Sequence, residues 1–392
     1  MIMSKQIIPL CEPYLSGKEW PYVKECFDSG WISTAGPFIG RFEEKVAQCV
    51  GASHAIGVAN GTVALHLALL AAGVQADDEV LIPTLTFIAP ANVIRYAQAH
   101  PVFMDVDPKT WQMDVNKVEQ FLREECLFEN GICRNRKTMR RVRAILAVHL
   151  LGLCCEMDRL WALAQEFQLK LIEDAAEGMG VRYQGKHVGT FGDFGVLSFN
   201  GNKLITAGGG GMVLTSHKES AERVRYLATQ AKDDPNEFFH GTIGFNYRLT
   251  NLHAAVGFAQ MEEIESRIAK KREIASFYKK QLQNIYGLTL MPQVSNCEST
   301  YWLYTLLLEK EGQRKVVLQN FHQQDIMARP LFHPIHRLPP YIETQAYKIE
   351  AAEFIYARAI CLPSSLGLSK EDLETVVACL TKTLSREDGK HV

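Results

Sequence analysis

The chain has 392 residues and a mass of 44.1 kDa, which is enough for roughly two to three domains with cores of their own. Its apolar fraction of 47% and charged fraction of 22% are those of a globular protein and exclude a disordered or fibrous chain. Lysine and arginine number 42 against 44 aspartates and glutamates, so the net charge of -2 provides no field that would attract nucleic acid.

Residues 1–20 are expected to form an N-terminal arm. The segment MIMSKQIIPLCEPYLSG contains only the short apolar run IIPL, which is too short for the core of a signal peptide. Farther along, no stretch approaches the roughly eighteen apolar residues that a membrane span needs. We therefore expect a cytoplasmic protein without a membrane partner.

Residues 21–250 are expected to form one large α/β domain. From about residue 54 onward, short apolar runs alternate with helical patterns, which is typical of a sheet flanked by helices. Seven runs predict strands, namely HAIGVAN, DEVLIP, PVFMDV, RAILAVHL, KLIEDAA, FGVLSF and GMVLTS.

A helical pattern of about thirty residues follows this domain, and we expect one long connecting helix over residues 251–285. Residues 286–392 mix strand-like runs, such as YWLYTLLLE and IMARPL, with helices, and they are expected to form a smaller α+β domain. The last helix is expected to open at Ser369, because Ser followed by Asp three residues later resembles a capping box.

The ten cysteines stand in apolar segments without CxxC spacing. We expect them to be buried free thiols, because neighbouring cysteines such as Cys154 and Cys155 suit neither a disulfide nor a zinc site. No metal site is predicted.

Ligands in open α/β sheets bind beyond the carboxyl ends of the strands, so the loops that follow strands hold the candidate residues. After the first strand, Gly61 and Thr62 open a helix whose free N–H groups suit a phosphate, although a plain helix cap explains the same residues. After the second strand, Phe87 offers a face that could stack on a flat ring, or else it is a core side chain.

Two further residues suggest covalent chemistry. Asp174 ends an apolar run, where a carboxylate is costly to bury unless it meets a cation such as a pyridinium nitrogen. Lys203 stands between FGVLSF and the glycines Gly208–Gly211, where it could bond to a carbonyl, with an exposed turn as the alternative. Neither residue is diagnostic alone, but the order phosphate loop, aromatic, aspartate and lysine is specific.

These residues stand within motifs that resemble the DegT/DnrJ/EryC1/StrS aminotransferases, which aminate keto groups on nucleotide-linked sugars. The resemblance runs nearly end to end, through NGTVALHLALLAAG, DDEVLIPTLTF, FMDVDP, VHLLG, IEDAAEGMG, GDFGVLSFNGNK, GFNYRLTNLHAA and RPLFHPIHRLPPY. It implies a pyridoxal-phosphate-dependent transferase of fold type I. Such an enzyme has a three-layer α/β/α domain around a mixed seven-stranded sheet, followed by a smaller C-terminal domain.

The resemblance also implies roles for the catalytic residues. Lys203 matches the lysine that bonds to the cofactor and later moves a proton, and Asp174 matches the carboxylate that keeps the pyridine nitrogen protonated. Glu177 falls where many relatives have glutamine near the ring oxygen, so we expect it to be protonated or turned aside. Gly208–Gly211 depart from the GEGG of many relatives, which puts a nearby contact in doubt.

The remaining implied contacts are to the cofactor and the substrate. Phe87 matches the stacking aromatic. Gly61, Thr62 and Ser198 match phosphate contacts, and Asn246 matches a phosphate ligand from the neighbouring subunit, which implies a homodimer with shared active sites. The residues that lie where relatives contact sugar or nucleotide are Trp31, Ser33, Thr34, Arg329, His333 and His336.

The expected reaction moves an amino group from L-glutamate to C4 of a nucleotide-linked keto sugar. SFNGNKLITAGGGG and FNYRLTN most resemble the branch that uses UDP-linked 4-keto-6-deoxy N-acetyl sugars of legionaminic acid or bacillosamine type, for a surface polysaccharide or glycan. A GDP- or dTDP-linked, perosamine-like substrate is the alternative. A non-catalytic regulator is disfavoured because no basic helix-turn-helix precedes residue 40. A nicotinamide dehydrogenase is disfavoured because GxGxxG is missing after the first strand.

Overall fold

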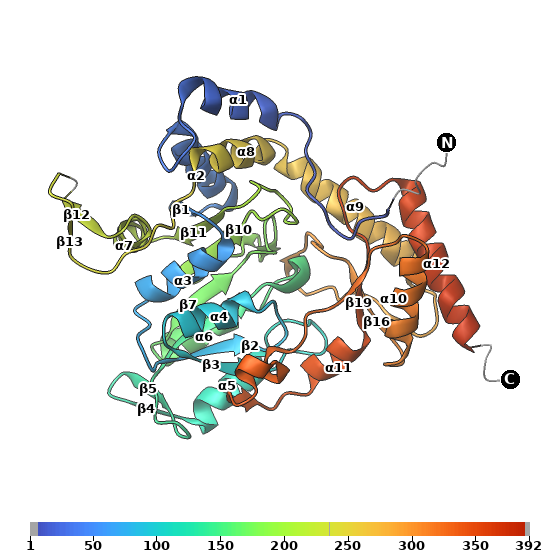
Figure 1. Ribbon diagram of the computed structural model, residues 1–392. Coiled ribbons are helices and arrows are strands. Elements are labelled where there is room, and N and C mark those ends of the chain that lie inside the picture. Colours follow the sequence, from blue (N-terminus) through green and yellow to red (C-terminus); the bar gives the residue numbers. More distant parts are fainter. Residues whose placement is uncertain (1–6, 235, 389–392) are drawn as a thin grey trace.

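A computed structural model describes residues 7–234 and 236–388. The first six residues of the predicted N-terminal arm and the last four of the predicted C-terminal domain lie outside the described residues. A large sheet occupies the centre of the molecule, and the C-terminal helices α10 (Gln313–Gln323) and α12 (Lys370–Asp388) lie to one side of it (Figure 1). Within the described segments, no helix is long and apolar enough to cross a lipid bilayer.

The central sheet has eight strands in the order β1-β11-β10-β7-β6-β2-β3-β18. The strands are β1 (His54–Val58), β2 (Glu79–Pro83), β3 (His100–Met104), β6 (Val142–Val148), β7 (Lys170–Asp174), β10 (Phe194–Ser198), β11 (Gly211–Thr215) and β18 (Ala346–Tyr347). β11 is antiparallel to both its neighbours, and the pairs from β10 to β18 are parallel. The predicted mixed sheet is confirmed. It has one strand more than predicted, because the C-terminal region contributes β18.

Helices cover both faces of this sheet, which confirms the three-layer α/β/α fold. One face packs against α3 (Gly61–Ala71), α4 (Ala89–Tyr96) and α7 (Lys218–Ala228). The other packs against α2 (Pro37–Val50), α5 (Val115–Glu124), α6 (Met157–Glu166) and α8 (Asn251–Met261). Successive residues of a strand point to opposite faces of the sheet. Val80 and Ile82 pack into the core on the α3 side, and Leu81 packs into the core on the α2 side. The second core continues into the C-terminal region without a break.

The predicted single helix over 251–285 is wrong, because the structure has two helices, α8 and α9 (Ile264–Leu282). The chain leaves helical geometry at Glu263, with φ -112° and ψ 12°. This break lets consecutive glutamates meet different partners: Glu262 accepts from the Tyr22 hydroxyl at 2.9 Å, and Glu263 pairs with Lys18 at 3.0 Å. No glycine or proline marks the position, so the helical pattern of the sequence runs straight through it.

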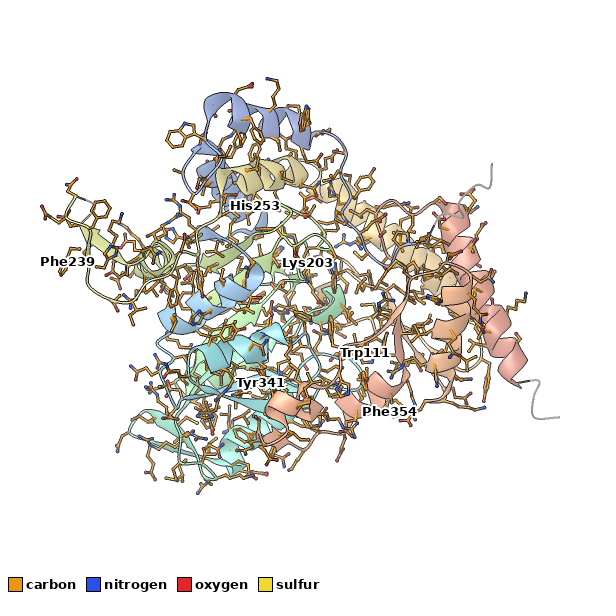
Figure 2. The ribbon with its side chains drawn as sticks, in the orientation of Figure 1. Trp111, Lys203, Phe239, His253, Tyr341 and Phe354 are labelled. Atoms are coloured by element: carbon orange, nitrogen blue, oxygen red, sulfur yellow. The ribbon has the colours of Figure 1, made fainter. Side chains whose placement is uncertain are left out.

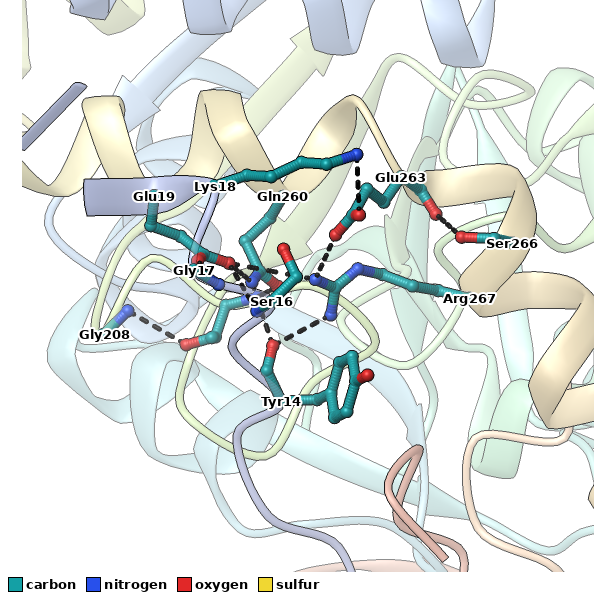
Figure 3. Close-up of polar contacts among 11 residues, drawn as sticks. Tyr14, Ser16, Gly17, Lys18, Glu19, Gly208, Gln260, Glu263, Ser266 and Arg267 are labelled. Carbon is teal, nitrogen blue, oxygen red and sulfur yellow. Dashed lines mark hydrogen bonds and ion pairs between the residues drawn. The ribbon is translucent and has the colours of Figure 1, made fainter. Parts of the chain in front are cut away.

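The same junction holds the N-terminal arm against the two helices (Figure 3). Gln260 donates from Nε2 to the Tyr14 carbonyl at 3.0 Å and to Glu19, and Arg267 donates to the Tyr14 carbonyl at 3.0 Å. Arg267 is buried and also bonds to Glu263 at 3.2 Å. The arm then leads into α1 (Glu19–Ser29), which lies along α8 (Figure 1).

The C-terminal region has a smaller antiparallel sheet in the order β14-β16-β19-β17. Its strands are β14 (Leu288–Thr289), β16 (Thr305–Leu308), β17 (Arg329–Pro330) and β19 (Ala359–Cys361). The predicted capping box at the start of α12 is confirmed: the Ser369 hydroxyl accepts from Asp372 N–H, and the Asp372 carboxylate accepts from Ser369 N–H.

Short elements complete the fold. They are the hairpin β4 (Cys126–Glu129) and β5 (Ile132–Asn135), the three-stranded group β8 (Arg182–Tyr183), β9 (Lys186–His187) and β15 (Cys297–Glu298), the hairpin β12 (Lys232–Asp234) and β13 (Phe239–His240), and three 3-10 turns at Leu150–Gly152, Ile335–Arg337 and Pro339–Tyr341. The β12–β13 hairpin projects from the body of the molecule, with Phe239 near its tip (Figures 1 and 2).

Asp105 ties the C-terminal region to the large sheet. Its buried carboxylate accepts from Lys117 Nζ at 2.7 Å and from the N–H groups of Glu350, Ala351 and Ala352 at 2.9 Å each. These three N–H groups open α11 (Ala351–Arg358), so one carboxylate from the end of β3 caps a helix that is more than two hundred residues away in the sequence. Burial alone would raise the pKa of Asp105, but the hydrogen bonds from Lys117 and the three N–H groups hold it below its ordinary value.

Replacing Asp105 by alanine is therefore expected to lower the free energy of unfolding by about 2 to 3 kcal/mol, because it leaves buried N–H groups and an ammonium without their acceptor. A group with a lowered pKa stabilises the fold above its unfolded-state pKa, so the difference from the unmutated protein should shrink as the pH falls through the folded-state value. Urea denaturation at neutral and acidic pH measures both effects. Asp107→Ala is the control, because this half-buried carboxylate bonds, among the described residues, only to N–H groups of its own turn, and an equal loss in both variants would contradict this account.

Candidate active site

A cavity of about 320 Å³ opens at the carboxyl ends of the central strands. All the predicted cofactor contacts except Asn246 line it, namely Gly61, Thr62, Phe87, Asp174, Glu177, Ser198 and Lys203. They come from four different segments, at or just after the ends of β1, β2, β7 and β10. Lys203 lies near the middle of the molecule, where the large sheet meets the C-terminal region (Figure 2).

The N-terminus of α3 forms one end of the cavity. Asn60 caps this helix by accepting from Val63 N–H at 3.0 Å, which leaves the N–H groups of Gly61 and Thr62 at the open end of the helix. A Cβ on Gly61 would lie 2.9 Å from Cβ of Ser198, so glycine is what allows α3 to approach the end of β10. The N–H groups of the first helical turn, two hydroxyls and the positive end of the helix dipole suit a phosphate.

The glycine run after Lys203 serves packing next to the cavity. A Cβ on Gly211 would lie 2.5 Å from the carbonyl carbon of Asn60, and Gly210 adopts φ 110°, a conformation that few other residues tolerate. These glycines bring β11 against the loop that caps α3. They do not line the cavity themselves.

Asp174 ends β7 and is 6% exposed. Burial raises the pKa of its carboxyl above the ordinary value, while Ala176 N–H, Lys203 and His149 act in the opposite direction. Within residues 7–234 and 236–388, its carboxylate accepts one hydrogen bond, from Ala176 N–H at 3.0 Å. A buried carboxylate with so few protein partners suits a cationic ring nitrogen.

Glu173, the preceding residue, has several hydrogen-bond donors around its carboxylate. It accepts from His149 Nε2 at 3.0 Å and from the N–H groups of Gly189, Phe191 and Gly192 at 2.7 to 2.8 Å. Glu173 and His149 are completely buried, so this pair holds the loop between β9 and β10 in place beneath the cavity. Sequence reasoning missed both residues, because neither lies at an apparent loop.

Lys203 is held between two side chains. Its Nζ lies 3.7 Å from Oε1 of Glu177 and 4.2 Å from the centre of the Trp302 ring, and its side chain is 15% exposed. Its N–H donates to the Asn200 carbonyl at 3.0 Å, so the segment before it is an ordered turn. The amine therefore lies inside the cavity, and the alternative of an exposed turn is excluded.

Glu177 has a buried carboxylate whose two oxygens face different partners. Oε2 accepts from Leu151 N–H at 2.7 Å, and Oε1 faces Lys203. Leu151 has φ 63°, a left-handed conformation that non-glycine residues rarely adopt. Burial raises the pKa of Glu177 to about 7, against the opposing effects of Lys203 and Leu151 N–H. Of the two expected states of Glu177, protonated or turned aside, the raised pKa favours the protonated one.

Phe87 is 56% exposed and presents its ring to the cavity. It makes an edge-to-face contact with Phe332, with ring centres 5.8 Å apart. A large exposed aromatic side chain in a cavity suits stacking on a flat ligand, so the core-residue alternative does not apply to Phe87.

These residues fit pyridoxal phosphate. The N-terminus of α3 and Ser198 would hold the phosphate, Phe87 would stack on the ring, and Asp174 would meet the ring nitrogen. Lys203 would bond to the aldehyde carbon. When bound, pyridoxal phosphate would supply an electron-withdrawing ring within reach of a substrate. In the described part of the chain, no three His, Cys, Asp or Glu side chains gather as metal ligands.

Asn246 lies elsewhere, in a second hollow of about 680 Å³ beside the β12–β13 hairpin. Thr34, Lys232, His240 and Arg248 also line this hollow. Apolar side chains are exposed around it, namely Trp31, Ile32, Phe238, Phe239 and Ile243. Asn246 thus does not reach the cavity that contains Lys203 of its own chain.

None of the six predicted substrate contacts lines the Lys203 cavity. Trp31, Ser33 and Thr34 lie in the loop between α1 and α2, where the carbonyls of Trp31 and Ser33 bind Asn251. Arg329 is exposed on β17.

The two predicted histidines are engaged elsewhere. His333 packs against Tyr356, with ring centres 4.6 Å apart. His336 bonds to Thr84 at 2.8 Å and to Glu353 at 3.2 Å, which indicates a structural role.

The structure adds cavity residues that the sequence did not single out. Phe332, next to His333, lines the cavity, as do Asn200, Asn202 and Trp302. Asn200 and Asn202 flank Gly201 in SFNGNK, so their nearness to Lys203 was a usable signal. Trp302 is about one hundred residues farther along, in a segment that reads as an ordinary strand.

The sequence profile of the DegT/DnrJ/EryC1/StrS aminotransferase family matches residues 13–381. Among known proteins, the GDP-perosamine synthase of Escherichia coli O157:H7 is 42% identical over 366 residues, covering 93% of this chain and 95% of the relative. The GDP-perosamine synthase of Caulobacter vibrioides is 37% identical over 380 residues, covering 96% and 98%. Among solved structures, the aminotransferase TlmJ from Streptoalloteichus hindustanus has a TM-score of 0.88 at 27% identity, over 97% of this chain and 100% of that one.

The raised pKa of Glu177 gives a pH dependence of stability. Between the ordinary glutamate pKa of 4.5 and the folded-state value of about 7, the unfolded chain releases this proton and the folded chain retains it, so rising pH destabilises the fold. Glu177→Gln should remove a loss of about 2 to 3 kcal/mol between pH 5 and pH 8. Urea denaturation of the cofactor-free protein at both pH values measures this, with Glu222→Gln on the exposed face of α7 as control. Parallel pH dependence in the Glu177→Gln and unmutated proteins would disprove it.

Proposed function

Because the chain belongs to the DegT/DnrJ/EryC1/StrS aminotransferase family, we propose that it transfers an amino group from L-glutamate to C4 of a GDP-linked 4-keto-6-deoxy sugar. The predicted family and the predicted pyridoxal phosphate cofactor are confirmed by the family match and the relatives. The protein is a transaminase of nucleotide-linked sugars.

The observation that carries the reaction is the meeting of Lys203 and Asp174 in one cavity. Asp174 would hold a proton on the ring nitrogen of pyridoxal phosphate, and the bound group would supply electron withdrawal from the reacting carbon. Lys203 carries the proton at Nζ, taking it from one carbon and delivering it to another in each half of the reaction. Asn200, Asn202 and Phe332 line the cavity, and we expect the sugar to enter beside them.

The choice of GDP rests on the relatives. Two proteins that share more than a third of their residues with this chain over almost its whole length carry the name GDP-perosamine synthase. The UDP-linked N-acetyl sugar expected from local motifs has weaker support than this alternative, because it rested on two short segments. An amino sugar of this type would serve a surface polysaccharide. The cytoplasmic location and the absence of a nucleic-acid partner stay predictions.

We also propose that the enzyme acts as a homodimer with shared active sites. The second hollow contains Asn246 and lies beside exposed apolar side chains, which a partner chain would cover. In a two-fold dimer, the same face of both chains meets, so Asn246 of each chain could reach the phosphate site of the other. The predicted contacts Trp31, Ser33 and Thr34 lie on this same face, and the nucleotide would bind between the chains.

The substrate is tested through the visible absorption of the loaded enzyme. The band of the lysine-bound cofactor should disappear on addition of L-glutamate, because the amino group moves to the cofactor. It should then return on addition of a GDP-linked 4-keto-6-deoxyhexose, at a rate at least about tenfold above that with UDP- or dTDP-linked keto sugars, a difference of about 1.4 kcal/mol. Recovery that is fastest with a UDP-linked N-acetyl keto sugar would restore the first expectation. A band that ignores glutamate would refute the proposed amino donor.

The shared site is tested by complementation between two inactive chains. Lys203→Ala and Asn246→Asp chains, carrying different tags, are co-expressed and the mixed dimer is purified. If Asn246 serves the partner's site, the mixed dimer has one site with both residues intact and should show about half the activity of the unmutated dimer.

The control pairs Lys203→Ala with Asp174→Ala, whose side chains line the same cavity of one chain, so their mixed dimer should stay inactive. An inactive Lys203→Ala and Asn246→Asp dimer would place Asn246 in the site of its own chain, and a fully active Asn246→Asp homodimer would show that Asn246 serves no site.

A further inference from the structure

Trp302 reaches Lys203 from the C-terminal region. It lies between β15 and β16 and is 3% exposed, and its ring lies 4.2 Å from Nζ of Lys203. Its indole N–H donates to the carbonyl of Asn202 at 2.8 Å, which fixes the peptide that leads into Lys203. One side chain thus contacts both the amine and the backbone of the lysine.

The backbone of Trp302 is itself held firmly. Its carbonyl accepts from Lys271 Nζ at 2.8 Å, and Lys271 is buried, also donating to the Ser364 carbonyl. On the other side, Gly152 accepts from Thr300 N–H at 3.1 Å, and a Cβ on Gly152 would lie 2.5 Å from the Trp302 nitrogen. The ring therefore has little freedom to leave the cavity.

Glu177 faces the same amine, with Oε1 3.7 Å from Nζ. Its other oxygen is fixed by Leu151 N–H, so the carboxylate is aimed at the lysine. The titratable groups whose charges act on this cluster are Asp174, which interacts with both Lys203 and Glu177, and Cys361, whose thiol feels the charge of Glu177. Of these, Glu177 alone is paired with Nζ, because no other salt bridge joins Lys203 to a described residue.

We propose that Trp302 is a positioning residue for Lys203. Together, Trp302 and Glu177 form a two-sided holder for the lysine's free amino group. The face of an aromatic ring and a carboxylate both favour a cation, so together they keep the charged amine in the cavity whenever it is not bonded to the cofactor. The role in turnover rests on the proposed function, in which Lys203 must be released and then return. The holder itself is a property of this chain without any ligand.

The competing explanation is that Trp302 only fills space. If the ring only filled space, its removal would lower the stability of the protein and change the access of reagents to Lys203. The removal would not change the balance between the charged and the neutral amine. The experiment must therefore separate access from charge, and the pH profile of amine reactivity does so. A change of access alters the reaction rate at every pH, whereas a change of charge preference moves the midpoint of the profile.

The probe is acetic anhydride, applied to the cofactor-free protein in trace amounts over a range of pH, with acetylation of the Lys203 peptide measured by mass spectrometry. Trp302→Met removes the ring face and keeps an apolar side chain, Trp302→Phe keeps a ring, and Glu177→Gln removes the carboxylate. Phe332→Leu opens the same cavity at a side chain that packs against Phe87, which makes it the matched control.

We expect the midpoint to fall by about 1 pH unit in Trp302→Met and in Glu177→Gln, and by clearly less in Trp302→Phe. Phe332→Leu should change the rate and leave the midpoint in place. An unmoved midpoint in a folded Trp302→Met protein overturns the proposal, as does a shift of equal size in Phe332→Leu. Should Trp302→Met fail to fold, an unmoved midpoint in Glu177→Gln overturns the two-sided holder.

A separate arm tests the proposed function. The unmutated protein is incubated with pyridoxal phosphate and reduced with borohydride, and the adduct is located by mass spectrometry. An adduct on Lys203 supports the proposed role of this lysine. A protein without that adduct refutes the role of Lys203 in the proposed function and with it the part of Trp302 in turnover, while the acetylation profile still decides whether the holder exists.

Discussion

The carboxylate of Asp174 is the constraint around which the site is built. It is buried at the end of β7 and receives a single hydrogen bond within the described chain, from Ala176 N–H. A buried carboxylate of this kind lowers the stability of the fold unless a cation pairs with it, and interactions elsewhere in the fold must offset that loss. Side chains alternate along a strand, so Glu173 points to the opposite side, where His149 and three N–H groups satisfy it completely. One carboxylate of the pair stabilises the fold, and the other is the one that we propose for the cofactor.

Much of this site could be predicted from the sequence because its chemistry is local. The run KLIED ends a strand with a carboxylate, NGT opens a helix after a strand, and SFNGNK places a lysine after another. Strand ends of a parallel sheet meet at one edge, so these loops had to come together. The glycines Gly210 and Gly211 allow a close approach between β11 and the α3 cap, and the pattern of the sequence alone did not identify these partners.

The features that escaped prediction depend on contacts between distant segments. β18 is two residues long, and its place beside β3 follows from Asp105 capping α11, which no local pattern reveals. The break between α8 and α9 is set by partners on the N-terminal arm, while the sequence there keeps its helical period. His333 and His336 were expected to contact the substrate because they stand where relatives of the resembled family do so, but Phe332 is the one that lines the cavity. Residue type alone could not show which way that loop faces.

The position of Lys203 depends on residues that lie far apart in the sequence. The carbonyl of Asn202, just before the lysine, accepts from the indole of Trp302 at 2.8 Å and from the thiol of Cys11 at 3.1 Å. Lys271 joins these two donors, since it lies 3.7 Å from the Cys11 sulfur and bonds to the Trp302 carbonyl. The N-terminal arm, α9 and the C-terminal region therefore converge on one peptide bond. The C-terminal region is thus part of the candidate site, because Trp302 and Phe332 line the cavity and Trp302 binds the peptide that precedes the lysine.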